Sequence, residues 1–320
     1  MSTRCLFSII LCAFCVSLAD PVSLAAHQAQ TPDWCKSLPR PEYKSLERVQ
    51  ISDPWFEVYK VAPNTFAIYE PHQFEEVISY LIAGKDSAIL FDTGMGISDI
   101  HKLVTQLTPR PIIVLNSHTH NDHVGGNWQF DTIYAMDTDF TRQNAKGSSD
   151  DAQDELTPGQ ICGELPKGFD AKSYRTKPWT VTKYVQDGDV LDLGGRDIQI
   201  IATPGHAPDS ICLLDSAAGL LFTGDTYYPA PIWLYRPETD LAAYESSVLR
   251  LRLHVQNVKL VLGSHNIPVA SPMVLPKLAV ASSELQAAAR GKGKAHCKPA
   301  GTGKKSCKIG DFTFLLHATP

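Results

Sequence analysis

The stretch that most constrains what this chain folds into is SHTHNDHVGG, residues 117–126. Within six positions it places four side chains that commonly bind metals, namely His118, His120, Asp122 and His123. The whole chain of 320 residues has only 11 histidines, so its average composition does not explain this density. Imidazole nitrogens and carboxylate oxygens are the ligands that suit zinc and its first-row neighbours. The stretch therefore predicts a metal site.

The flanking sequence predicts where this site lies in the fold. Residues 111–115 (PIIVL) form a short, β-branched apolar run that is typical of a buried strand. Gly125 and Gly126 follow the ligands and allow the backbone to turn tightly. We therefore expect the ligands on the loop that leaves the end of a strand, where their side chains converge on one point.

The composition indicates a globular protein. Hydrophobic residues make up 43% of the chain and charged residues 20%, so we expect a packed core. The formal net charge is −5, which lacks the basic footprint of a general nucleic-acid binder. We expect no nucleic-acid partner.

The N-terminus has the features of a secretory signal peptide over residues 1–25. Arg4 precedes an apolar stretch at residues 5–18, which is short for a membrane span. Small residues permit cleavage after Ala19 or Ala25, and an uncleaved membrane anchor is the alternative. We expect export to the periplasm or the cell exterior, with no stable membrane insertion after cleavage. Residues 26–50 are expected to be an irregular leader and residues 51–320 a single domain.

Five cysteines remain after the predicted signal peptide is removed, and export permits disulfides between them. Cys297 and Cys307 flank a Gly- and Lys-rich segment and are the first candidates for a pair. Cys35 with Cys162 is a second, weaker candidate. Cys212 lies in an apolar strand pattern and is expected to be a buried thiol. Sequence alone leaves the full connectivity open.

The rest of the chain alternates predicted strands and helices. Apolar runs of strand length, bounded by turn residues, occur at 56–61, 65–69, 77–82, 88–91, 111–115, 132–135, 181–185, 190–193, 198–202, 211–214, 220–225, 259–263 and 312–316. Apolar residues at helical spacing, or a helix-like context, occur at 97–107, from 137, at 239–256 and at 274–290. The polar segment of about residues 146–180 is long for a connection, and such loops are often functional. Its composition is compatible with a lid over the site and equally with an excursion away from it.

Three further residues of ligand type follow predicted strands. His206 lies in TPGHAPDS, Asp225 ends the apolar run LLFTGD, and His265 follows a strand in GSHN. A carboxylate at the end of an apolar strand is costly unless it is paired, hydrogen-bonded or bound to a metal. We therefore group these three residues with the first motif.

The motifs HTHNDH, TPGH, TGD and GSH occur in the order and with the spacing of the metallo-β-lactamase superfamily, which the chain resembles over about residues 56–316. The resemblance implies an α+β fold, a four-layer αββα sandwich in which two mixed β-sheets pack face to face with helices outside. It places the metals in a groove at one edge of the paired sheets.

The resemblance also implies a role for each ligand. A first metal would be held by His118, His120 and His206, and a second by Asp122, His123 and His265, with Asp225 bridging both. We expect two Zn²⁺ per chain, which share a hydroxide that attacks a carbonyl carbon. Asp122 and Asp225 would orient the ions and the hydroxide and are our candidate catalytic carboxylates.

The resemblance narrows the reaction without naming the substrate. The superfamily's β-lactamases often replace the bridging carboxylate, so Asp225 favours hydrolysis of a lactone, thioester or amide over β-lactamase activity proper. A mononuclear iron sulfur dioxygenase on the same fold is the alternative from another class, although His123 and His265 favour a filled second metal site.

Residues 227–235 (YYPAPIWLY) form an aromatic segment with two interpretations. It is either the wall of a pocket for an apolar substrate group or part of the core. Tyr227 and Tyr228 are candidates for donating a hydrogen bond to a developing oxyanion. We expect a small-molecule substrate that carries an apolar group.

Overall fold

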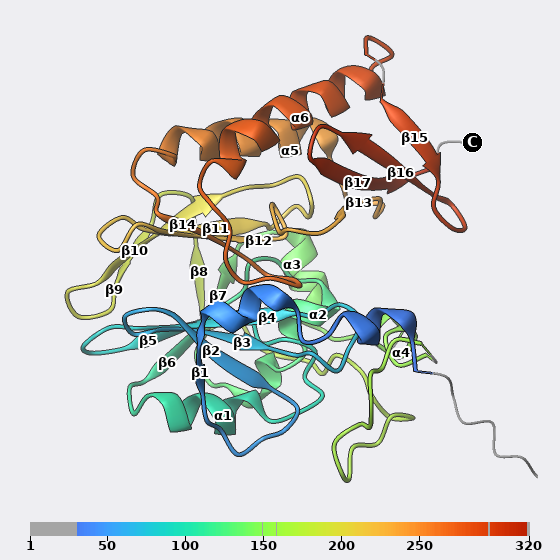
Figure 1. The fold of residues 1–320 in the computed structure, drawn as a ribbon. Coiled ribbons are helices and arrows are strands. Elements are labelled where there is room, and N and C mark those ends of the chain that lie inside the picture. The colour runs from blue at the N-terminus through green and yellow to red at the C-terminus, as the bar shows by residue number, and fades with distance from the viewer. Residues whose placement is uncertain (1–30, 149, 158, 294, 319–320) are drawn as a thin grey trace, which may run out of the picture. The chain divides into compact units, whose positions relative to one another are not determined.

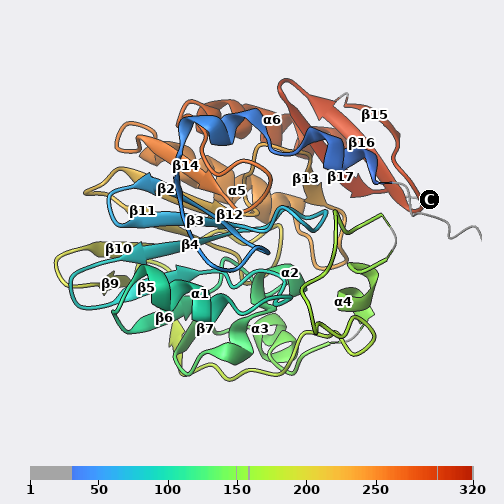
Figure 2. The same cartoon turned by 60° about the horizontal axis from the view of Figure 1, so that its bottom comes forward.

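Two β-sheets lie face to face in the computed structural model, and helices cover their outer faces (Figures 1 and 2). The structure describes residues 31–318 except 149, 158 and 294. The predicted signal peptide and the first residues of the predicted leader lie outside this range. Among the described residues, no helix combines the length and the apolar character needed to cross a bilayer.

The first sheet contains eight strands in chain order. Strands β1 to β5 are antiparallel neighbours, and β5 to β8 are parallel, so the sheet is mixed. Their bounds are β1 (Glu47–Val49), β2 (Glu57–Ala62), β3 (Thr65–Tyr69), β4 (Ile78–Ala83), β5 (Ala88–Phe91), β6 (Ile112–Leu115), β7 (Ile133–Met136) and β8 (Lys183–Val185).

The second sheet contains five strands in the order β14-β12-β11-β10-β9. β12 and β14 are parallel and the other neighbours are antiparallel, so this sheet is also mixed. The bounds are β9 (Val190–Asp192), β10 (Asp197–Ala202), β11 (Ile211–Asp215), β12 (Leu220–Gly224) and β14 (Leu260–Gly263).

A third, smaller sheet lies beyond the sandwich, in the order β13-β17-β16-β15. Its strands are β13 (Ile232–Leu234), β15 (His296–Pro299), β16 (Lys304–Ile309) and β17 (Phe312–His317). Only the strand at 312–316 was predicted. β15 and β16 lack the apolar pattern of a buried strand. β13 lies within the aromatic segment 227–235, for which we predicted no strand.

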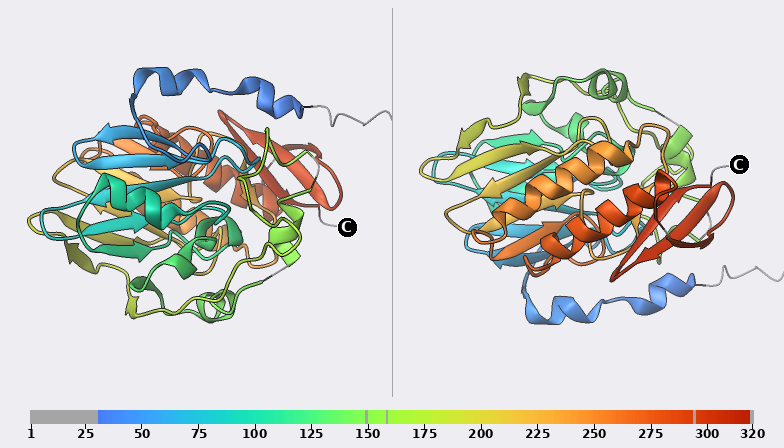
Figure 3. Two further views of the ribbon diagram at one scale, coloured as in Figure 1. Left: turned by 90° about the horizontal axis from the view of Figure 1, so that it is seen from below. Right: turned by 90° about the horizontal axis from the view of Figure 1, so that it is seen from above.

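The α-helices are α1 (Ile100–Leu107), α2 (Asn121–Val124), α3 (Asp139–Asn144), α4 (Asp150–Asp154), α5 (Leu241–Leu251) and α6 (Val274–Ala289). α1 lies on the outer face of the first sheet, and α5 and α6 lie side by side on the outer face of the second (Figures 1 and 3). Four 3₁₀ helices complete the described elements, namely η1 (Asp33–Ser37), η2 (Pro41–Ser45), η3 (Asn127–Gln129) and η4 (Arg252–His254).

Three hydrophobic clusters correspond to the three interfaces between these layers. One fills the space between the two sheets, one lies between the first sheet and α1, and one lies between the second sheet, α5, α6 and the small sheet. β4 shows how a strand serves two of them, because Tyr80 points into the space between the sheets whereas Leu81 points towards α1. A strand buried on both faces is continuously apolar, and such runs gave the sequence its clearest strand signals.

The segment before residue 51 differs from the irregular leader that we expected. Its described part forms η1, η2 and the edge strand β1. Arg40 forms a two-point ion pair with the buried Glu76, and Tyr43 stacks on Tyr69 with ring centroids 4.6 Å apart. These contacts hold the segment against the first sheet.

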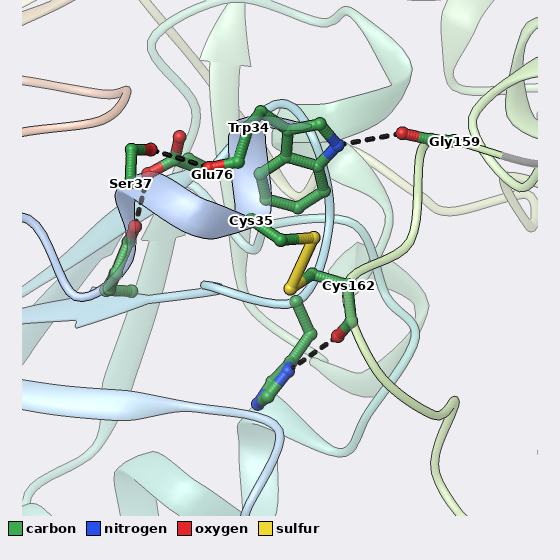
Figure 4. Close-up of a disulfide and its surroundings, with 8 residues drawn as sticks. Trp34, Cys35, Ser37, Glu76, Gly159 and Cys162 are labelled. Atoms are coloured by element: carbon green, nitrogen blue, oxygen red, sulfur yellow. Dashed lines mark hydrogen bonds between the residues drawn. A yellow bond between two sulfur atoms is a disulfide. The ribbon is translucent and has the colours of Figure 1, made fainter. Parts of the chain in front are cut away.

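Both expected disulfides are present, Cys35–Cys162 and Cys297–Cys307, and Cys212 is a buried free thiol. Figure 4 shows the first of them, which joins η1 to the long segment of about residues 146–180. That segment contains the short helix α4 and is otherwise irregular among its described residues.

Candidate metal centre

The seven predicted ligands come from four strand ends that meet at one edge of the sandwich. His118 and His120 follow β6, and α2 carries Asp122 and His123. The other three, His206, Asp225 and His265, follow β10, β12 and β14. The structure therefore brings together residues that are up to 147 positions apart in the sequence.

A glycine allows one of these strand ends to approach another closely. Gly224, directly before Asp225, has a φ of 50°. A Cβ atom at this position would lie 2.5 Å from the Cβ of Ser117, on the loop that carries the first motif. Only glycine fits here, because a side chain would both strain the backbone and force the two loops apart.

Three histidines form a first group of ligand atoms. His120 Nδ1 lies 2.8 Å from His118 Nε2 and 3.1 Å from His206 Nε2. Burial lowers the pKa of His206 to about 4 and that of His118 below its ordinary value. These two imidazoles are therefore neutral at neutral pH, which is the form that binds a metal.

Asp122, His123 and His265 form a second group. Asp122 Oδ2 lies 3.2 Å from His123 Nε2 and 3.6 Å from His265 Nε2. Burial alone would lower the pKa of His265, but the charges of Asp225 and Asp122 outweigh burial and raise the pKa to about 9. In this group the positive charge of the protonated His265 compensates the negative charge of the carboxylates. A bound metal ion would supply this positive charge instead and displace the proton.

Asp225 lies between the two groups. Its Oδ1 is 3.1 Å from His265 Nε2 and 3.4 Å from His123 Nε2, whereas its Oδ2 is 3.6 Å from His206 Nε2. Burial would raise the pKa of Asp225, but the neighbouring histidines, with His265 first, lower it. One carboxylate thus faces both sets of histidines in its ionised form.

Two buried atoms show that the protein alone does not satisfy this cluster. His123 Nε2 and Asp225 Oδ1 are both buried, and neither has a partner with hydrogen-bond geometry, although Asp122 Oδ2 and His265 Nε2 lie 3.2 Å and 3.1 Å from them respectively. Buried polar atoms in folded proteins nearly always have a partner. The nitrogen and oxygen atoms within each of three overlapping groups (His118, His120 and His206; His118, His123 and Asp225; Asp122, His123 and His265) lie within 4.8 Å of one another. The residues therefore fit one or two metal ions of the zinc type.

Comparisons with known proteins identify the family. The sequence profile of the metallo-β-lactamase superfamily matches residues 74–265. The chain belongs to the metallo-β-lactamase superfamily.

Characterised relatives within the superfamily are distant. The chain is 27% identical over 184 residues to the human acyl-coenzyme A thioesterase MBLAC2, a match that covers 54% of this chain and 66% of the human protein. It is 28% identical over 197 residues to the lactamase-like protein aptB of Emericella nidulans, covering 60% of this chain and 51% of that protein. The match therefore spans less than two thirds of either relative.

Solved structures confirm the αββα fold. The metallo-β-lactamase FIM-1 from Pseudomonas aeruginosa aligns with a TM-score of 0.52 and 17% identity, over 74% of this chain and 99% of that one. The mixed sheets and outer helices predicted from the sequence are those of the superfamily. Family membership and the relatives together support an enzyme of the hydrolase class.

Carboxylates hold the outer ring nitrogens of two of the predicted histidine ligands. His120 Nε2 lies 2.6 Å from Glu238 Oε1, and His123 Nδ1 lies 2.9 Å from Asp92 Oδ2. A carboxylate on the outer nitrogen fixes the orientation of a metal-binding imidazole and raises its basicity. Each group of ligands thus contains one histidine that is supported by an anion.

Neutral groups hold the remaining three histidines. The Nδ1 of His118 lies 3.0 Å from Ser117 Oγ. The Nδ1 atoms of His206 and His265 each lie 2.7 Å from a backbone carbonyl oxygen, that of Trp233 and that of Glu75 respectively. All five rings are therefore oriented by contacts on the side away from the centre.

Sequence reasoning did not identify Asp92 or Glu238 as part of the site. Asp92 is fully buried, has a φ of 68°, and accepts a hydrogen bond of 2.6 Å from the backbone N–H of Ser117. Asp92 directly follows the predicted strand at 88–91, as the candidate ligands follow theirs, and this position was a signal that we did not use. Glu238 gives no such signal, because it lies in the connection between β13 and α5, and β13 itself was missed.

The two candidate tyrosines occupy different environments. The Tyr228 ring lies 4.8 Å from the His265 ring, and its hydroxyl oxygen accepts a hydrogen bond of 3.1 Å from the backbone N–H of Trp233. Tyr227 instead packs in the hydrophobic cluster beneath α5 and α6, with Phe312 6.3 Å away. The structure therefore brings Tyr228 to the metal centre and places Tyr227 in the core, against our expectation of a catalytic role for it.

A cavity of about 290 Å³ lies beside His120. Ser148 and Thr176, from the two ends of the long segment, form part of its wall, and Arg236 also lines it. Glu155 of the same segment is close enough to the centre that burial and then the charge of Asp122 raise its pKa to about 7. The long segment thus borders the centre, which resolves one of the alternatives left open by the sequence.

Proposed function

We propose that this protein is an exported zinc hydrolase that cleaves acyl thioesters with water at a two-metal centre. The observation that carries this proposal is the position of Asp225, with one oxygen towards His206 and the other towards His123 and His265. A carboxylate placed in this way can serve two ions at once. In hydrolytic two-metal sites generally, the two ions lie roughly 3.5–4 Å apart.

Each part of the chain has a defined task in this proposal. His118, His120 and His206 would hold the first ion, and Asp122, His123 and His265 the second. When bound, zinc lowers the pKa of water to near neutrality and polarises the substrate carbonyl. Asp92 and Glu238 keep two of the ligand rings in place through hydrogen bonds to their outer nitrogens.

The reaction requires no nucleophile from the protein. Water adds its oxygen to the carbonyl carbon, the carbon–sulfur bond breaks, and the products are a carboxylic acid and a thiol. Burial raises the pKa of Tyr228 well above its ordinary value, so its hydroxyl keeps its proton at neutral pH. Because the hydroxyl oxygen already accepts from Trp233, the O–H remains available to donate to the carbonyl oxygen of the substrate.

The choice of a thioester rests on the relatives. The human, bovine and chicken proteins that match this chain bear the name acyl-coenzyme A thioesterase. The retained Asp225 is compatible with this class. The lactone and amide hydrolases that the sequence also permits share the same attack by water on a carbonyl carbon, and they are the first alternatives to test.

Export is supported by the cysteines. Two disulfides join four of the five cysteines outside the predicted signal peptide. Disulfides persist in oxidising compartments and are rare in the cytosol. We therefore propose that the mature protein acts in the periplasm or outside the cell. The thiol half of its thioester substrate would then be a compound that occurs outside the cytoplasm.

A substrate panel tests the proposal. The purified protein should hydrolyse a short-chain acyl thioester faster than an acyl-homoserine lactone, nitrocefin and bis-(nitrophenyl) phosphate, and His120→Ala should abolish the activity. Preference for nitrocefin would establish β-lactamase activity proper instead. Oxygen uptake with a persulfide substrate, without hydrolysis of any ester, would establish the dioxygenase and overturn the proposal.

A further inference from the structure

One cavity lies outside the metal centre, between the C-terminal half of α6, the small sheet and residues 234–241. Its volume is about 810 Å³. We refer to it as the C-terminal cavity. Much of its lining comes from residues 285–317, which lie outside the part of the chain that the superfamily profile matches. The profile match alone therefore does not account for this cavity.

The floor of the C-terminal cavity is apolar. Leu234 and Leu241 line it from one side, Leu285 from α6, and Leu316 from the small sheet. The four leucine side chains belong to, or pack against, the hydrophobic cluster that holds α5, α6 and the small sheet together. A cavity with such a floor favours a ligand with a hydrocarbon group.

The described polar side chains around this floor are basic or neutral. They are Arg236, Lys305, His296 and His317, with the hydroxyl of Thr239, and no Asp or Glu occurs among the described lining residues. Lysine and arginine beside an apolar surface form charge-assisted hydrogen bonds with a carboxylate or phosphate. The cavity therefore suits an anion that carries a hydrocarbon group.

The distribution of charge along the chain strengthens this preference. Residues 290–320 contain seven Lys and Arg residues and one Asp, although the formal net charge of the whole chain is −5. The positive charge is thus concentrated in the segment that forms the small sheet and the end of α6. Such a local concentration of one sign attracts ligands of the opposite sign.

Arg236 connects the C-terminal cavity with the metal centre. It lines both this cavity and the smaller one beside His120. It is also two residues before Glu238, whose carboxylate contacts His120. The two cavities are therefore neighbours that share Arg236 as a lining residue.

We propose that the C-terminal cavity binds an apolar carboxylate, that is, a carboxylate joined to a hydrocarbon chain. The choice of a carboxylate over other anions rests on the proposed hydrolysis of an acyl bond, because that reaction releases a carboxylic acid. The binding itself needs no turnover. It can therefore be tested independently of the reaction.

Isothermal titration calorimetry with decanoate tests the proposal on the full-length mature protein. Decanoate should bind with one equivalent per chain, and 1-decanol, which has the same chain without the charge, should bind more weakly. Ala288→Phe fills the cavity from α6, and Lys305→Met removes a cationic group from its wall. Each should raise the dissociation constant by about tenfold or more.

Two control variants make the same kinds of change outside the cavity. Val280→Phe adds a ring on the exposed face of α6, and Lys298→Met removes an exposed charge from β15. Both should leave the dissociation constant within about twofold of the wild-type value. Circular dichroism of all four variants checks that they are folded.

Three results would overturn the proposal. Decanoate that does not bind the wild-type protein would exclude the site. Equal weakening by cavity and control variants would show that only the overall charge or stability matters. Binding that survives Ala288→Phe but is lost when a chelator removes metal would place the ligand at the metal centre. If decanoate binds as predicted but no thioester is hydrolysed, the cavity stands and the proposed function fails.

Discussion

Glu238 and Asp92 each support one of the two groups of predicted ligands. Each carboxylate contacts the outer nitrogen of one ligand, His120 in the first group and His123 in the second. Loss of such a contact typically lowers metal affinity by about 10–100-fold. Because each carboxylate contacts only one of the two groups, its loss should affect one ion more than the other.

We therefore predict that Glu238→Ala weakens the first metal site by about 10–100-fold and leaves the second nearly unchanged. Glu238→Gln keeps a hydrogen-bond acceptor and should have a smaller effect. Competition with a chromophoric chelator measures both affinities on the purified protein. Asp92→Asn is the matched variant and should weaken the second site instead. Equal loss at both sites in Glu238→Ala would contradict this assignment.

Glu70 is a buried carboxyl group near the centre that predicts a pH dependence of stability. Its carboxylate accepts hydrogen bonds from Trp55 Nε1 at 2.6 Å and from the backbone N–H of Met95 at 2.9 Å. Burial outweighs these bonds and raises its pKa to about 7. The folded protein therefore holds this proton more tightly than the unfolded chain, whose glutamates have a pKa of about 4.3.

A pKa that is raised in the folded state stabilises the protein at low pH, and this stabilisation is lost as the pH rises through 7. We predict that the free energy of unfolding of the wild type, relative to Glu70→Gln, falls by up to about 3 kcal/mol between pH 4.5 and pH 8. Urea unfolding of both metal-free proteins at several pH values measures this difference. A constant difference across the range would show that Glu70 does not titrate as described.

At the residue scale, the sequence was informative where the chemistry is local. His118, His120, Asp122 and His123 stand out because they crowd six positions, and the structure brings His206, Asp225 and His265 to them. Residues that act through another residue leave no such trace. Glu238 contacts a histidine 118 positions away, and only the fold brings the two together. The role of the seven residues as ligands remains a prediction.

The long segment that borders the metal centre is held at one point by a disulfide. Cys162 of this segment is joined to Cys35 of η1, and two hydrogen bonds beside the disulfide add to this link (Figure 4). Trp34 Nε1 donates to the carbonyl of Gly159 at 2.8 Å, and the carbonyl of Cys162 lies 3.0 Å from His72 Nδ1. The N-terminal segment thus anchors the middle of the long segment, whose two ends line the cavity beside His120.

Removing this disulfide should cost more stability than removing the other one. Cys35 and Cys162 are 127 positions apart, whereas Cys297 and Cys307 are 10 apart. In the chain-entropy description, closing loops of these lengths contributes about 5 and about 3 kcal/mol respectively. We predict that Cys35→Ser/Cys162→Ser lowers the free energy of unfolding more than Cys297→Ser/Cys307→Ser. Denaturant unfolding of the two double variants compares them directly, and the reverse order would contradict the prediction.

The same disulfide should control the protease sensitivity of the long segment. We predict that Cys35→Ser/Cys162→Ser is cleaved faster than the wild type between residues 155 and 170, because a segment with few remaining anchors opens locally. Mass spectrometry of the fragments locates the cuts. The other double variant, whose disulfide lies in the small sheet, is the control and should be cut there no faster than the wild type. Equal rates in all three proteins would show that hydrogen bonds alone hold the segment.

At the element scale, the strands that the sequence predicted are those with continuous apolar runs. All thirteen predicted strands have counterparts, and all of them except β9 contain buried residues. β15 was missed because its four residues are all exposed, and β16 because three of its six residues are lysines, so neither has the apolar pattern of a buried strand. α1 begins at Ile100 rather than at 97, because the side chain of Asp99 accepts from the N–H of Lys102 and caps the helix there.

In the whole molecule, the hydrophobic clusters that stabilise the fold and the residues proposed to bind metal occupy different regions. Three hydrophobic clusters hold four layers together, and the candidate ligands gather at one edge where four strands end. The C-terminal cavity shares Arg236 with the cavity beside His120, and much of its lining follows residue 265, where the profile match ends. Fold and ligand set were accessible from motifs that the superfamily shares, whereas the cavity was not, because only tertiary structure assembles it.

The zinc content of the purified mature protein, measured by elemental analysis together with thioester hydrolysis, tests the two-metal centre most directly. We predict about two zinc ions per chain in the active wild type. His265→Ala should retain about one ion and lose most of the activity, because only the second group of ligands is disrupted. A wild type that hydrolyses the thioester with a single zinc, and that His265→Ala leaves fully active, would contradict the account.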